Sequence, residues 1–135
     1  MKYDLTFIGY VNTFETFTKA GVKDCFFDKN NNLVFVVNTG DAGKAIGKFG
    51  SNIKRLNGLL KKNIKVLEYN ENVVQFVRNC LMPLKVEDII AEEKKVIIKT
   101  DDKRLKGLIF GRDKANLKEL SETVKRFFDV EVIVA

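Results

Sequence analysis

Gly47 and Gly50, separated by two residues, form the loop of this chain whose composition best suits a charged ligand. Glycine lacks a Cβ atom, so a phosphate-bearing backbone can approach the main chain closely at such a loop. A helical pattern follows, and the unpaired N–H groups and dipole at a helix N-terminus favour an anion. Lys48 in the loop, with Lys54 and Arg55 beyond it, adds positive charge. The spacing alone fits a tight turn between helices equally well. The loop is predicted as a phosphate site because it lies between two helical patterns at the peak of positive charge and recurs in a repeat.

Two other phosphate-binding glycine loops are excluded by their spacing. A Walker loop has four residues between its glycines and a hydroxyl residue after Gly-Lys. Here three residues separate Gly43 from Gly47, and Phe49 follows Lys48. The dinucleotide fingerprint needs glycine where this chain has Ala45. The loop is therefore not predicted to serve a nucleotide-dependent enzyme.

The charge distribution also favours a polyanionic partner. The net charge is +6, and residues 41–65 hold seven basic residues and one acidic residue. Residues 99–126 hold nine basic and five acidic residues. Basic charge gathered in this way is typical of nucleic-acid binding. The chain has no histidine, which removes the commonest general base and a common metal ligand. We therefore predict no enzyme activity, no catalytic residue, no metal and no cofactor.

The two basic stretches are copies of one unit. Residues 45–56 align with residues 109–120 at a constant offset of 64, with glycine, asparagine, lysine and the final leucine identical. Such a repeat indicates duplication of a structural unit. The second loop, Gly111-Arg112-Asp113-Lys114, lacks the second glycine and carries a carboxylate. We predict two domains, residues 1–70 and residues 71–135, the second with a degenerate loop.

Apolar periodicity gives the same order of elements in both copies. In the first we expect a helix over 5–20, strands over 23–28 and 33–37, a helix over 41–46, the loop 47–50, a helix over 51–62 and a strand over 64–69. In the second we expect a helix over 73–81, strands over 86–92 and 96–99, a helix over 104–110, the loop 111–114, a helix reaching residue 127 and a strand over 130–134.

Three segments resemble a known family. Residues 39–56, from Thr39-Gly40-Asp41 through the glycine loop, closely resemble the first K-homology (KH) module of archaeal NusA-like transcription factors. Residues 14–25 are similar to the N-terminal helix and strand of that module, and residues 76–86 to the segment that enters the second module. The resemblance implies an α+β fold of two tandem type II KH domains, α-β-β-α-α-β repeated, each a small three-stranded sheet packed on helices.

The same resemblance implies RNA binding connected with transcription termination or antitermination. The expected partners are single-stranded RNA and RNA polymerase or a transcription complex, with no small-molecule substrate. Phe49 either stacks on a base or packs on the neighbouring module, and Asn52 either caps its helix, contacts phosphate, or does both. The RNA-binding residues predicted in the two copies are Gly47, Lys48, Phe49, Gly50, Asn52, Lys54 and Arg55, and Gly111, Arg112, Lys114 and Lys118.

Two alternatives stay open at this point. One is a KH-fold scaffold for protein interactions, which the degenerate second loop favours. The other is a factor associated with ribosomal RNA or the ribosome that binds RNA mainly through its first domain. We expect a cytoplasmic protein without a membrane partner, because the longest apolar run, residues 33–37, is too short to cross a bilayer and the N-terminus turns polar early.

Overall fold

Five consecutive apolar residues form β2 (Leu33–Val37), the central strand of the first of two sheets. The computed structural model describes residues 5–135 and divides into two units, one ending at Tyr69 and the other beginning at Asn70. In the first unit β1 (Val22–Phe27) pairs antiparallel with β2, and β3 (Ile64–Glu68) pairs parallel with it. All five residues of β2 are buried, as expected for the centre of a sheet.

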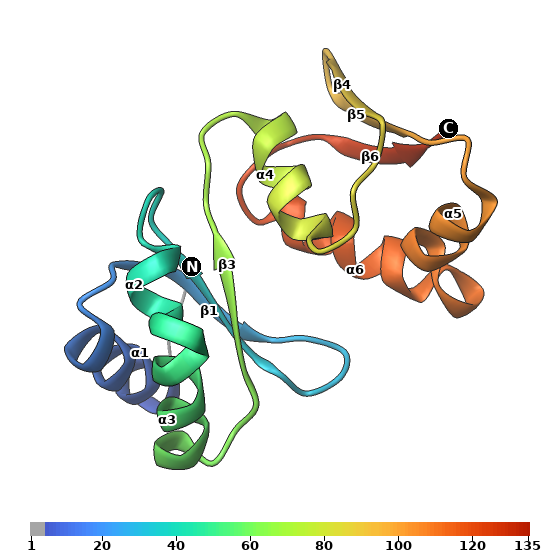
Figure 1. Cartoon of the computed structure of the whole chain (residues 1–135). Coiled ribbons are helices and arrows are strands. Elements are labelled where there is room, and N and C mark those ends of the chain that lie inside the picture. Colours follow the sequence, from blue (N-terminus) through green and yellow to red (C-terminus); the bar gives the residue numbers. More distant parts are fainter. Residues whose placement is uncertain (1–4) are drawn as a thin grey trace. The chain divides into compact units, whose positions relative to one another are not determined.

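Three helices cover one face of this sheet: α1 (Leu5–Thr18), α2 (Ala42–Ile46) and α3 (Ser51–Leu60). Figure 1 shows them gathered together beside the strands. The core lies between the two layers, where Phe14 of α1 stacks on Phe35 of β2 with ring centroids 4.0 Å apart. The apolar face of the sheet thus fixes where α2 and α3, and the loop between them, are held.

The second unit repeats the order α-β-β-α-α-β (Figure 1). Its strand order β4-β5-β6 has the same antiparallel and parallel pairings as the first sheet. This architecture confirms the predicted α+β fold of two tandem type II KH domains. The elements are α4 (Val73–Leu81), β4 (Asp88–Glu92), β5 (Lys95–Lys99), α5 (Lys103–Phe110), α6 (Ala115–Lys125) and β6 (Glu131–Val134).

The helix bounds agree with the sequence prediction to within a few residues, and α4 has the predicted bounds. Asn72 and Asp102 cap α4 and α5, each accepting two hydrogen bonds from backbone N–H groups of the first turn. α3 ends at Leu60 because Lys61 adopts a left-handed conformation with φ of 53°. α6 ends at Lys125, before Phe127, whose ring packs edge-on against Phe76.

In the part of the chain that the structure describes, no helix has the length and apolar character needed to cross a membrane.

Candidate nucleic-acid interface

The loop between α2 and α3 has an unusual backbone. Gly47 has φ of 76° and ψ of 170°, Phe49 has φ of 56° and ψ of 30°, and Gly50 has φ of 72° and ψ of 19°. Three of its four residues therefore have positive φ. The turn is closed by the amide of Gly50, which donates a hydrogen bond to the carbonyl oxygen of Gly47 over 3.1 Å. The chain leaves α2 and enters α3 within four residues.

The two glycines of this loop are needed to different degrees. A Cβ atom on Gly47 would lie 2.8 Å from Cγ and 2.9 Å from the backbone nitrogen of Asn52, which is too close. Its φ and ψ also lie in a region that is essentially restricted to glycine. At Gly50, a Cβ atom would have no atom of the described residues within 4 Å. Its left-handed conformation costs another residue about 1–2 kcal/mol. Gly47 is thus required, whereas Gly50 is replaceable.

The second loop has the same backbone although it lacks the second glycine. Gly111 has φ of 69° and ψ of 178°, Asp113 has φ of 54° and ψ of 31°, and Lys114 has φ of 62° and ψ of 22°. The amide of Lys114 donates to the carbonyl oxygen of Gly111 over 3.2 Å, which matches the bond in the first loop. A Cβ on Gly111 would lie 2.5 Å from Cγ of Asn116. The copy retains the glycine that geometry demands and replaces the other.

Asn52 holds the first loop in shape by bonding backwards along the chain. Its Nδ2 donates a 2.8 Å hydrogen bond to the carbonyl oxygen of Lys44 in α2, and Asn116 makes the matching 2.9 Å bond to Leu108 in α5. These bonds satisfy carbonyl groups near the C-terminal ends of α2 and α5, which have no partner within a helix. Sequence reasoning placed Asn52 as a cap of α3 or a phosphate ligand. The structure shows its side chain bridging α2 and α3, and the contact with phosphate stays a prediction.

The N-termini of α3 and α6 are open to an anion. The residue before α3 is Gly50, which has no side chain. The residue before α6 is Lys114, whose ammonium group can donate hydrogen bonds but cannot accept one from a backbone N–H group. Neither residue can cap its helix. Neither helix has an acidic residue in its first turn, but Asp113 lies two residues before α6. The partial positive charge of the helix end is therefore not offset at α3, whereas at α6 a carboxylate lies in the loop before it.

The predicted site residues fall into two groups, one in each unit. The side chains of Lys48, Phe49 and Lys54 are exposed around the first loop. Arg55 is exposed as well, but its guanidinium carbon lies 5.9 Å from the centre of the Phe17 ring in α1. Arg55 thus makes a cation–π contact with Phe17 of α1. In the second unit Arg112, Lys114 and Lys118 are exposed around the loop that begins at Gly111.

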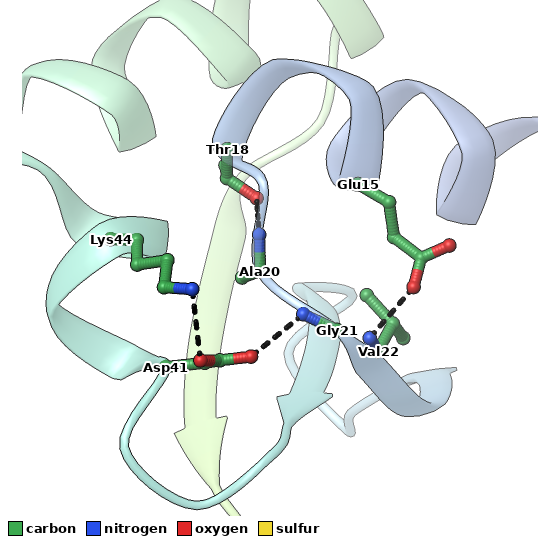
Figure 2. A network of polar contacts seen from close by, with 7 residues as sticks. All are labelled: Glu15, Thr18, Ala20, Gly21, Val22, Asp41 and Lys44. Carbon is green, nitrogen blue, oxygen red and sulfur yellow. Dashed lines mark hydrogen bonds and ion pairs between the residues drawn. The ribbon is translucent and has the colours of Figure 1, made fainter.

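Asp41, which precedes α2, anchors the helix that leads into the first loop (Figure 2). One carboxylate oxygen accepts a 2.8 Å hydrogen bond from the amide of Gly21, and the other lies 3.4 Å from Nζ of Lys44. The bond from Gly21, with a smaller contribution from Lys44, lowers the pKa of Asp41 below its ordinary value. Sequence analysis missed this role, which no local pattern at Asp41 indicates because its partner lies twenty residues earlier.

The same view shows how the joint between α1 and β1 is held (Figure 2). Thr18 accepts a hydrogen bond from the amide of Ala20 over 3.1 Å, and Glu15 accepts one from the amide of Val22 over 2.9 Å. Backbone groups at the turn between α1 and β1 are thereby satisfied. These bonds hold the turn that carries Gly21, the hydrogen-bond partner of Asp41. Within residues 5–135, no group of three or more histidine, cysteine, aspartate or glutamate side chains is placed to hold a metal ion.

Comparison with known proteins finds relatives along nearly the whole chain. The family model described as "KH domain" matches residues 10–86. The "Probable transcription termination protein NusA" of Halobacterium salinarum is 30% identical over 125 residues, covering 91% of this chain and 89% of that protein. The crystal structure of APE1850 has a TM-score of 0.77 and 34% sequence identity, covering 98% of this chain and 99% of the other.

Two relatives from methanogens are longer than this chain. The protein of the same name from Methanococcus vannielii is 40% identical over 79 residues, which are 58% of this chain and 45% of that protein. The protein from Methanocaldococcus jannaschii is 28% identical over 120 residues, covering 86% of this chain and 64% of that protein. The chain thus spans less than two thirds of the length of these two relatives.

Proposed function

The chain belongs to the archaeal NusA-like family of KH domain proteins, and we propose from this premise that it binds single-stranded RNA through its first glycine loop. The matching family model and the name of the Halobacterium salinarum relative support an RNA-binding NusA-like protein, and in this proposal it has no enzymatic activity. KH folds recognise splayed bases of single strands, whereas the deep, narrow major groove of duplex RNA excludes side chains. Selection for the single strand is the finer part of the proposal.

One observation carries the proposal. The loop between Gly47 and Gly50 ends at the open N-terminus of α3, within residues 41–65, where seven basic residues face one acidic residue and the net positive charge is higher than in residues 99–126. Backbone amides, the helix dipole and the exposed Lys48 then act on the same volume, and each favours an anion there. A phosphate group of RNA has the charge and the acceptor oxygens that this arrangement suits.

We assign the contacts by analogy between the two copies. In the first, the loop residues with Lys54 and Arg55 contact the RNA backbone, and Asn52 acts by holding the loop. In the second, Gly111, Arg112, Lys114 and Lys118 extend the contact more loosely, because the carboxylate of Asp113 at the loop tip repels phosphate. The first unit anchors the strand in this proposal.

The biological setting we propose is transcription termination or antitermination. The relatives from Halobacterium salinarum and the two methanogens carry the name "Probable transcription termination protein NusA". A transcription complex would present a nascent single strand, which is the ligand that the loop is proposed to take. RNA polymerase, or the complex that contains it, is accordingly the expected protein partner.

A matched pair of charge reversals tests the site. Lys48→Glu changes the loop, and Lys61→Glu makes the same charge change at the far end of α3, about 15 Å away at 1.5 Å per residue. Both lysines are exposed. We expect Lys48→Glu to weaken binding of a ten-nucleotide single strand about 30-fold, and Lys61→Glu to weaken it less than threefold.

The measurement is fluorescence anisotropy of labelled RNA at several salt concentrations, with a duplex of equal length as competitor. The parent protein should prefer the single strand, and its affinity should fall with salt with a slope of about −0.7 per phosphate neutralised. Lys48→Glu should reduce that slope by about one such step. Equal effects of the two reversals, or equal affinity for single strand and duplex, would refute the proposed site.

A further inference from the structure

Phe49, in the first glycine loop, is the most exposed large apolar side chain in the part of the chain that the structure describes. Its side chain is 88% exposed at the tip of the first loop. It also holds a positive φ, which is uncommon for any residue other than glycine and unusual for a bulky one. Strained residues of this kind gather at sites that bind ligands. A ring that is so exposed buries almost no apolar area in the fold, and its backbone conformation is strained. A contribution to ligand binding would account for both features.

The second copy shows that the loop does not need an aromatic residue at this place. Asp113 occupies the same position with φ of 54° and ψ of 31°, against 56° and 30° for Phe49. The backbone conformation is the same, but the side chain at the tip is a carboxylate instead of an aromatic ring. The ring of Phe49 is therefore not a requirement of the turn.

We propose that Phe49 stacks on a base of the RNA strand that the first loop holds by its phosphates. This inference rests on the proposed function and deepens it: the first loop takes a base face as well as a phosphate. Base–aromatic stacking tolerates any sequence, because every base has a π-face. The first unit thus gains affinity for single strands that carry unpaired bases, and the second unit, with Asp113, does not.

The surroundings of the ring favour RNA over a protein partner. Nζ of Lys48 lies 5.6 Å from the centre of the Phe49 ring, so cationic charge accompanies the aromatic face. Residues 41–65 carry seven basic residues and one acidic residue, a composition that attracts a polyanion. Charged residues are depleted at the core of protein interfaces, so a ring accompanied by Lys48 within a basic stretch fits nucleic acid better.

The chain contains no tryptophan, which allows a direct test of stacking. Phe49→Trp places the only tryptophan at the loop tip, and a stacked base quenches indole fluorescence. Leu59→Trp places it on α3, where Leu59 is 60% exposed, and serves as the matched control. Phe49→Leu retains an apolar side chain of similar size without an aromatic face. Each protein is titrated with a ten-nucleotide strand and with an abasic strand of equal phosphate number.

We expect Phe49→Leu to bind the base-bearing strand about tenfold more weakly than the parent, and the abasic strand equally well. The emission of Phe49→Trp should fall along the same titration curve as the anisotropy of the labelled strand, while that of Leu59→Trp changes little. Parent-like binding of Phe49→Leu to both strands would overturn the inference. So would equal quenching in the two tryptophan variants.

The proposed function fails separately from this inference. If Lys48→Glu abolishes binding while Phe49→Leu has no effect, the phosphate site stands and base stacking is refuted. If the parent binds neither strand, the proposed function itself is refuted. Circular dichroism of each variant checks that the fold is retained. We expect it to be retained in the Phe49 variants, because this side chain is almost fully exposed.

Discussion

Replacing the two loop glycines by alanine should have unequal effects on stability and binding. In Gly47→Ala the added Cβ would lie 2.8 Å from Cγ and 2.9 Å from the backbone nitrogen of Asn52. The backbone nitrogen begins a packed helix and cannot move aside as the tip of a flexible side chain does. The φ of 76° and ψ of 170° add strain of about 1–3 kcal/mol. We expect a total loss of about 3 kcal/mol.

Gly50→Ala meets a milder environment. The new Cβ has no described atom within 4 Å, and φ of 72° with ψ of 19° is ordinary left-handed backbone. The conformational penalty of about 1–2 kcal/mol is partly offset, because alanine restricts the unfolded chain by about 0.4–1 kcal/mol. A net loss of about 1 kcal/mol follows. Lys114, with φ of 62° and ψ of 22°, shows that the second unit already accepts a side chain there.

The assay is urea unfolding followed by circular dichroism, with RNA affinity measured on the same variants. Because the chain has two units, hydrogen exchange of the amides at the start of α3 locates the effect in the first one. Gly111→Ala serves as a repeat of Gly47→Ala in the second unit, since its Cβ would lie 2.5 Å from Cγ of Asn116. Gly47→Ala should lose RNA binding and Gly50→Ala should retain most of it. Equal losses of stability at the two glycines, or a larger loss at Gly50, would refute the asymmetry.

Three further changes address the surroundings of the loops. Asn52→Asp replaces a donor by a carboxylate facing the carbonyl of Lys44 and should lower the free energy of unfolding by about 2 kcal/mol, measured in urea. The hydrogen bond from the amide of Gly21 lowers the pKa of Asp41, so the Asp41 carboxylate stabilises the fold above about pH 4, and this stabilisation is lost as pH falls through the folded-state pKa. Asp41→Asn should therefore flatten the fall in melting temperature on the acid side. An unchanged pH profile of the melting temperature would contradict this prediction. Asp113→Lys should tighten binding of a long single strand about tenfold at low salt and leave a five-nucleotide strand unaffected, and equal gains on both would contradict the assignment of an extended contact.

The repeat allowed much of the fold to be predicted. Two copies of glycine, asparagine, lysine and leucine at a constant offset identified the duplicated unit, and apolar periodicity placed every helix and strand to within a few residues. The run Leu33–Val37 was predicted as a strand and forms the fully buried β2. Element ends were less predictable, because α3 ends at the left-handed conformation of Lys61, which its sequence does not announce.

The candidate site was predicted in composition but not in mechanism. The sequence places Gly47, Lys48 and Gly50 together because they are neighbours in the chain, and it marks Asn52 because Asn116 repeats it. The bond from Asn52 to Lys44 spans eight residues across a turn, and only the folded geometry decides that the side chain bridges two helices instead of capping one.

By itself, then, the sequence determined the order of elements, the duplication, the gathering of basic charge and the position of the loop, since all of these depend on residue type and spacing. The tertiary structure decided which glycine is indispensable, because that depends on how close Asn52 approaches Gly47 in space. It also decided that the loop ending at Lys114 keeps the backbone of a glycine loop. A left-handed residue with open space beside it accepts a side chain at modest cost, whereas a residue facing a packed helix start does not.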